Sequence, residues 1–270
     1  MSFQPIIVGT GLVGWQFLKA TQDTQRAVFD KSTDLVRDTD YFKKNIGNVK
    51  TAEDLVSDRR LRRVALGAFG LQDDIDNKFF IQKILEEGGA ASDSLANKMS
   101  DDRYKALASA FAFDSPVGAR TQLSFFGEEI VSKYRQQSFE VAVGEQDDTL
   151  RIALNFHRAL PEIGGSGSSG DTNWFRVMGT TALRTVFETA LGLPTGFGQL
   201  DIDQQLEVFR DKVQSRFGVS EVSEVADPEI MEKVVQSYLL QTQVQQFSQS
   251  GSGMVALSLL QSIPRTSILG

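Results

Sequence analysis

The repeated stretch reads LRRVALGAFGL at residues 61–71 and LRTVFETALGL at residues 183–193, with six of the eleven positions identical. Two further matches follow in the same order. Asp74-Ile75-Asp76 returns as Asp201-Ile202-Asp203, and Asp101 and Asp227 each precede another helical pattern. An internal repeat usually means that one supersecondary unit was duplicated and that the copies bury each other's apolar faces. We therefore predict two related helical units, at about residues 51–113 and 175–241.

Helical spacing of apolar residues dominates the chain, and strand patterns are nearly absent. We predict a single all-α domain over residues 1–270, with about eight to ten helices and the two related units around a long central helix. The first helix should cover about Leu12 to Leu35. The central helical region should run from about Thr121 to Leu160, and Gly144 is the point at which it would bend or split.

The helix boundaries carry recognisable capping residues. Gly70 and Gly192 stand where a helix ends in a left-handed residue, and Thr51 opens a capping-box variant. Aspartates precede the helices that follow, where a carboxylate can accept hydrogen bonds from free backbone amides. The predicted caps are Asp74 or Asp76, Asp201 or Asp203, Ser100 or Asp101, and Asp227.

Two polar stretches are expected to be flexible. Gly164 to Gly170 is rich in glycine and serine and is the best boundary between the halves of the chain. Gln245 to Gly253 reads as a mobile tether in front of a short apolar tail.

Composition excludes several classes of function. The chain has no cysteine, one histidine and a net charge of −7, which rule out thiolate chemistry and argue against a nucleic-acid partner. No stretch approaches the roughly 20 apolar residues of a membrane span. The N-terminus shows no cleavable secretory signal.

The motifs that suggest a binding site lack the surrounding residues or elements that such a site needs. Gly9-Thr10-Gly11-Leu12-Val13-Gly14 follows the dinucleotide pattern but lacks the strand–helix–strand unit around it. The paired aspartates of the repeat lack the glycine and glutamate of a calcium loop, and His157 has no second imidazole or thiol nearby in sequence. We therefore assign no catalytic, cofactor-binding or metal-binding residue and expect no cofactor.

Several stretches together resemble domain-of-unknown-function family 1217, which occurs mainly in Alphaproteobacteria. They include Tyr41 to Ile46, Asp54 to Leu61, Val64 to Leu71, Asp102 to Leu107, Phe139 to Gln146 and Val255 to Gln261. The resemblance implies a helical protein whose gene often lies among flagellar genes. It supplies no catalytic residue. It also implies a protein that is cytoplasmic or associated with the flagellum without a cleaved signal peptide.

These observations predict a non-enzymatic structural or interaction protein with a protein partner, associated with the bacterial flagellum as a minor component or as an assembly or export factor. The alternative is an enzyme or small-ligand binder with a pocket between the repeats. Apolar residues at both ends could dock on a partner or pack on the protein's own core, and we favour core packing for the N-terminal helix. The partner-binding candidates are Trp15, Phe17, Leu18, Leu257, Leu259 and Leu260.

Overall fold

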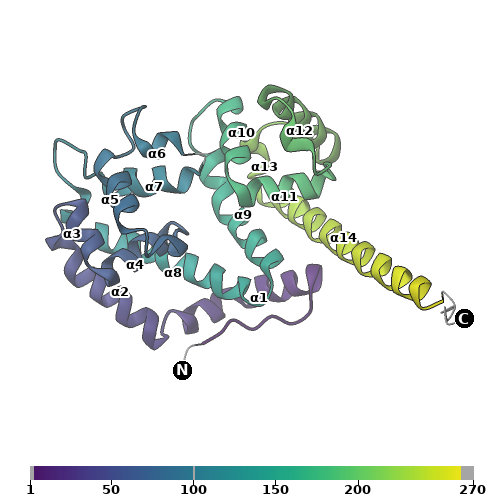
Figure 1. The fold of residues 1–270 in the computed structure, drawn as a ribbon, viewed down its shortest axis with the longest axis horizontal. Coiled ribbons are helices and arrows are strands. Elements are labelled where there is room, and N and C mark those ends of the chain that lie inside the picture. The colour runs from purple at the N-terminus through teal and green to yellow at the C-terminus, as the bar shows by residue number, and fades with distance from the viewer. Residues whose placement is uncertain (1–2, 100, 263–270) are drawn as a thin grey trace, which may run out of the picture.

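A computed structural model describes the backbone of residues 3–99 and 101–262, and side chains up to residue 248. This part of the chain is all-helical and contains no strand, as predicted (Figure 1). The elements are α1 (Gly11–Phe29), α2 (Thr33–Asn45), η1 (Ile46–Asn48), α3 (Ala52–Ser57), α4 (Arg59–Ala68), η2 (Gln72–Asp74), α5 (Lys78–Glu87), α6 (Leu95–Lys98), α7 (Asp102–Phe111), η3 (Arg120–Gln122), α8 (Phe126–Gly144), α9 (Asp148–Gly164), α10 (Gly170–Gly179), α11 (Thr181–Leu191), η4 (Phe197–Gln199), α12 (Ile202–Phe217), α13 (Val222–Val225) and α14 (Pro228–Ser262).

The α-helices are more numerous than the eight to ten that the sequence predicted, because both long helices are divided. The predicted first helix is split between α1 and α2, and the predicted central helix between α8 and α9. Asp147 causes the second break: its carboxylate accepts hydrogen bonds from the amides of Thr149 and Leu150 and so starts a new helix. The short helices α3, α6 and α13 are four to six residues long, too short to show apolar periodicity.

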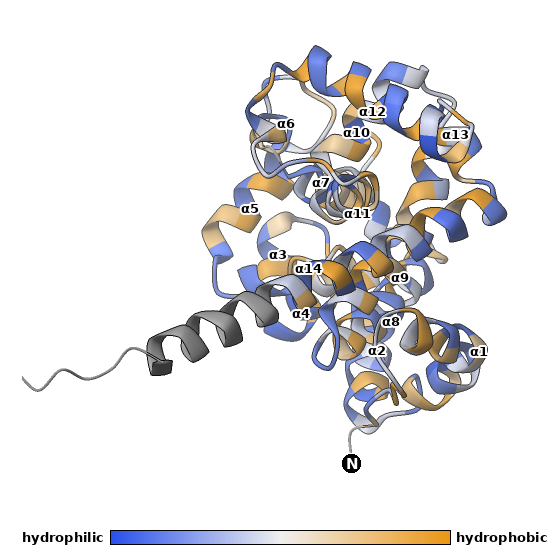
Figure 2. Ribbon diagram, turned by 90° about the vertical axis from the view of Figure 1, so that its right-hand side faces the viewer, coloured by the Kyte–Doolittle hydropathy of each residue, from blue (hydrophilic) through white to orange (hydrophobic). Residues whose placement is uncertain are grey.

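Two large hydrophobic cores share α8. The first core contains residues of α2 to α5, α7 and the start of α8, including Phe126 and Ile130. The second contains residues of α1 and of α9 to α14, together with Phe139 and Val143 from the end of α8. In Figure 2 the helices of the body carry both apolar and polar residues along their length, as expected for helices that each bury one face.

Aromatic rings fill the centre of the second core. The ring of Phe187 lies 5.2 Å from Trp174, 5.4 Å from Phe156 and 6.1 Å from Phe209, centroid to centroid, with steeply inclined planes. Such edge-to-face arrangements add to the free energy gained by burying the rings. Phe187 belongs to the second copy of the repeated stretch, which therefore lies at the heart of this core.

The two repeated units have the same order of elements. Each unit consists of a helix, a 3-10 turn, a second helix, a four-residue helix and a final helix. This order occurs from α4 to α7 and again from α11 to α14. Their surroundings differ, because α4 packs on α2 and α8 whereas α11 packs on α9 and α14. The duplication of the units stays a prediction.

Both copies of the repeat end in the same hydrogen-bonded cap. Gly70 and Gly192 have φ angles of 72° and 67°, and their amides bond to the carbonyls of Gly67 and Thr189. The next residues, Leu71 and Leu193, bond back to Leu66 and Glu188. These are complete Schellman motifs and match the predicted left-handed helix ends.

Most of the predicted N-caps are present. Thr51 forms a capping box with Asp54, Asp101 and Asp201 accept amide hydrogen bonds at the starts of α7 and α12, and Asp227 does so at the start of α14. The prediction that Asp74 or Asp76 caps α5 is wrong. The N-cap there is Asn77, and the Asp74 carboxylate accepts a hydrogen bond from the Tyr104 hydroxyl at 2.7 Å.

Of the two stretches predicted to be flexible, the first is shorter than expected and the second is helical. α9 continues through Gly164, and α10 begins at Gly170 after a Ser169 cap that accepts from the amide of Thr172. The predicted tether from Gln245 to Gly253 is part of α14, which runs without a break to Ser262. A glycine in a helix costs about 1 kcal/mol relative to alanine, which is too little to end a helix by itself.

Replacing Gly70 or Gly192 by alanine should lower the free energy of unfolding by about 1 kcal/mol each, because a Cβ is disfavoured at positive φ. The added Cβ would meet nothing within 4 Å at Gly192 and only an ordinary 3.5 Å contact at Gly70, so the backbone angle causes the loss. Gly196 is the matched control, since its φ is −81° and its added Cβ also meets nothing. Urea unfolding of the three variants measures the difference. A loss for Gly196→Ala equal to the other two would contradict this assignment.

Candidate interaction surface

The last helix, α14, begins inside the body and extends away from it (Figure 1). Asp227 caps its first turn, and Pro228 stands at the first helical position, where no amide donor is needed. The helix has 35 residues, which corresponds to a length of about 50 Å. A helix of this length has room for one segment that packs on the body and another that reaches beyond it.

The segment within the body buries one face of α14. Val234, Val235, Tyr238 and Leu239 are at most 3% exposed and belong to the second core. Their spacing places them on one side of the helix, since successive residues turn by about 100°. This side of α14 holds the helix to the body.

The opposite side carries exposed apolar residues. Leu240, Val244 and Phe247 are 48%, 58% and 79% exposed. Their spacing of four and three residues places them within about 60° of one another around the helix, turned away from the core-facing side. We call these three residues the α14 stripe.

The surroundings of the α14 stripe are polar but uncharged. No Asp, Glu, Lys or Arg occurs between Lys233 and Arg265. Glutamines flank the stripe, among them the half-buried Gln241 and Gln243. A glutamine amide both donates and accepts hydrogen bonds. The surface can therefore bind an apolar helix with polar edges without desolvating a charge.

A carboxylate anchors the base of α14. Glu232 accepts hydrogen bonds from Trp15 Nε1 at 3.3 Å and from Gln236 Nε2 at 3.1 Å, and it pairs with Lys19 Nζ at 2.7 Å. Burial by itself raises the pKa of the Glu232 carboxyl, but the hydrogen bonds from Lys19, Gln236 and Trp15 outweigh it and lower the pKa. Glu232 thus ties α1 to α14 close to the place where α14 leaves the body.

His157 of α9 lies against this carboxylate and is the one histidine of the chain. Its Nε2 is 3.7 Å from Glu232 Oε2, and its ring centroid is 5.2 Å from that of Trp15. Burial is the main influence on its pKa and lowers it, against the opposing charge of Glu232. The neutral imidazole therefore packs between α1, α9 and α14.

None of the partner-binding candidates chosen from the sequence belongs to the α14 stripe. Trp15 and Leu18 are at most 1% exposed and belong to the second core, while Phe17 is half-buried. Leu257, Leu259 and Leu260 fall within the backbone range of α14 but outside the residues whose side chains are described. Trp15 and Leu18 therefore pack inward, whereas Leu240, Val244 and Phe247 of α14 are exposed.

Sequence reasoning missed the α14 stripe because it took Gln245 to Gly253 for a tether. Two signals were available: the i, i+4, i+7 spacing of Leu240, Val244 and Phe247, and the absence of charge after Lys233. A continuous helix was needed to join them into one surface.

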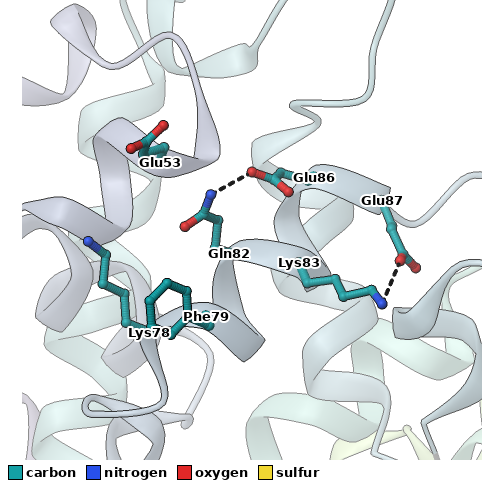
Figure 3. Close-up of a pocket in the computed structure, with 7 residues that line it drawn as sticks. All are labelled: Glu53, Lys78, Phe79, Gln82, Lys83, Glu86 and Glu87. Carbon is teal, nitrogen blue, oxygen red and sulfur yellow. Dashed lines mark hydrogen bonds and ion pairs between the residues drawn. The ribbon is translucent and has the colours of Figure 1, made fainter.

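Two hollows lie apart from this surface. A groove of about 470 Å³ lies along α3 and α5 and is lined by the exposed Phe79 (Figure 3). Beside Phe79, Lys83 pairs with Glu87 at 3.6 Å, and Gln82 donates a hydrogen bond to Glu86 at 2.7 Å. A smaller hollow, about 170 Å³, lies among α1, α8 and α9, where Arg158 donates to the buried Glu140 at 2.7 Å. The first hollow is lined by the first repeated unit alone and the second by residues outside both units.

Two further searches were made of the described residues. No three His, Asp or Glu side chains among them come together in a way that could hold a metal ion. Within the same part of the chain, no helix combines the length and apolar character needed to cross a membrane.

Comparison with known proteins places the chain in a family. The family model described as "Protein of unknown function (DUF1217)" matches residues 68–231, which is more than half of the chain, and the chain belongs to this family. The fold is similar to the crystal structure of protein AGR_C_984 from Agrobacterium tumefaciens, with a TM-score of 0.72 and 28% sequence identity. That match covers 90% of this chain and 98% of the other. The search of curated proteins gave no match.

Acidification should destabilise the protein through His157. The pKa of this residue is lowered in the folded state from about 6.5, so protonation favours the unfolded chain. The stability that neutral His157 contributes is fully present above pH 6.5 and is lost as the pH falls through its lowered pKa in the folded state. Glu232 loses its own contribution to stability only below pH 4.5, its ordinary pKa. Urea unfolding between pH 7.5 and 5 should show a decline in the wild type that is smaller in His157→Gln. Equal slopes for the two proteins would show that His157 is not responsible.

Proposed function

We propose that this member of the DUF1217 family is a non-enzymatic structural or interaction protein that binds a helical protein partner through the α14 stripe, in association with the bacterial flagellum. The observation that carries the proposal is the exposure of Leu240, Val244 and Phe247 on one side of a helix that extends beyond the body. The proposed flagellar role covers two cases: a minor axial component of the flagellum, or an assembly or export factor.

The stripe has the spacing that helix-binding surfaces use. A helix that binds a groove or another helix presents apolar anchors at i, i+3 or i+4 and i+7, and the α14 stripe has i, i+4 and i+7. Phe247 is 79% exposed, and large aromatic side chains are frequent among the residues that dominate interface affinity. The stripe therefore supports recognition of a partner helix.

The attachment of α14 to the body supports the same proposal. The part of α14 up to Leu239 packs in the second core, and Glu232 joins its base to Lys19 and Trp15 of α1. A surface on a firmly held helix loses less conformational entropy when it binds than one on a loose segment.

The flagellar part of the proposal is supported by the family alone. The sequence resembles proteins whose genes often lie among flagellar genes, and no observation on α14 points to a particular cell structure. The alternative of a ligand-binding pocket between the repeats has less support, because each of the two hollows is lined by one unit or by neither.

The proposal predicts that motility depends on the α14 stripe. Deletion of the gene should reduce swimming, and the wild-type gene should restore it. Val244→Asp should not restore it, because an unpaired carboxylate would be desolvated in the contact. A loss of about 2.8 kcal/mol of binding free energy would weaken the affinity for the partner about 100-fold. Swimming-zone diameter in soft agar, with protein amount checked by immunoblot, is the measurement.

The control is Gln245→Asp, which adds the same charge to an exposed position on another side of α14. It should restore swimming as well as the wild type does. Normal swimming of the deletion strain would refute the flagellar role. Full complementation by Val244→Asp would refute the role of the stripe.

A further inference from the structure

We infer that the partner of the α14 stripe is the same helix of a second copy of this chain, so that two copies associate through α14. This inference rests on the proposed function, in which α14 is a docking surface, and it names the occupant of that surface. Three features of α14 support it: its charge, its hydrogen-bonding groups and the side of the helix on which the stripe lies.

Charge restricts where two copies can meet. Each chain carries a net charge of −7, so two copies repel each other over most surfaces. The chain from Val234 to Pro264 has no charged residue, and it includes the whole α14 stripe. Contact between two α14 helices therefore brings no like charges directly together.

The polar groups beside the stripe suit a contact between identical surfaces. In a two-fold symmetric interface a residue i contacts residue j of the other copy, and j contacts i, so the surface must be complementary to itself. Apolar side chains and glutamine amides meet this condition, since an amide both donates and accepts. A different protein would usually be selected by opposite charges at the rim of the interface, and α14 carries none after Lys233 up to its end at Ser262.

The position of the stripe leaves room for a second copy. Val234, Val235, Tyr238 and Leu239 face the second core, and the stripe lies on the opposite side of the helix. When two stripes meet, each body lies on the far side of its own helix. Leu240 to Phe247 spans about 10 Å of helix, which gives a contact smaller than a standard specific interface. The association should therefore be weak and depend on concentration.

The absence of cysteine permits a direct test. Leu240→Cys, Val244→Cys and Phe247→Cys each place one thiol on the stripe of an otherwise cysteine-free chain, and Gln245→Cys is the control on another side of α14. A disulfide forms only when the two Cα atoms come within about 7 Å. Under mild oxidation, at least one stripe variant should give a covalent dimer in yields well above those of the control. Circular dichroism shows whether each variant is folded.

Sedimentation of the unmodified protein gives an independent readout. The wild type and Gln245→Asp should shift from monomer to dimer between about 1 and 500 μM, a range set by the weak association expected for a small contact. Val244→Asp should remain monomeric over that range. Chains that stay monomeric with no stripe cross-link would overturn the inference. Equal cross-linking by Gln245→Cys, or dimers that persist in Val244→Asp, would do the same.

These outcomes separate the inference from the proposed function. Monomeric wild type together with loss of swimming in Val244→Asp would leave the stripe as a docking site for a different protein. Dimers together with normal swimming of the deletion strain would support self-association and remove the flagellar role.

Discussion

The arrangement of the molecule depends on α8, a single helix that belongs to two hydrophobic cores. Phe126, Ile130 and Val131 near its start pack in the first core, and Phe139 and Val143 near its end pack in the second. Since the backbone hydrogen bonds of one continuous helix connect these residues, the two cores are held at a set distance. The buried Glu140 on α8, bonded to Arg158 at 2.7 Å, then joins α8 to the helix that follows.

The second core determines which surface of α14 remains available. It takes up α1 through Trp15 and Leu18 and uses Val234, Val235, Tyr238 and Leu239 of α14 on one side. Leu240, Val244 and Phe247 are not among the residues of this core and stay at least 48% exposed. The second core lies on the other side of the helix and does not bury these three residues.

Charge and hydrogen bonding divide α14 into two functional segments. Before Lys233 the helix carries Glu232, whose contacts with Lys19, Gln236 and Trp15 connect it to the body. After Lys233 it carries only neutral residues to its end at Ser262. The neutral segment packs in the second core through Leu239 and exposes the α14 stripe beyond it. This division connects the proposed interaction function with self-association, since both use the same exposed side of one helix.

The sequence by itself determined the helical class, the glycine caps at Gly70 and Gly192 and most of the aspartate N-caps, because these features depend on hydrogen bonds between residues a few positions apart. Tertiary structure decided the rest. Asp74 ends η2, four residues before α5 begins at Lys78, and its carboxylate instead accepts a hydrogen bond from the Tyr104 hydroxyl, 30 residues away in sequence. Trp15 and Leu18 had the apolar character of interface anchors but are buried against α9 and α14, whereas Val244 and Phe247 are 58% and 79% exposed. Apolar spacing shows that a helix has a face to bury, but which partner buries it depends on how the other helices pack, and that is set by contacts distant in sequence.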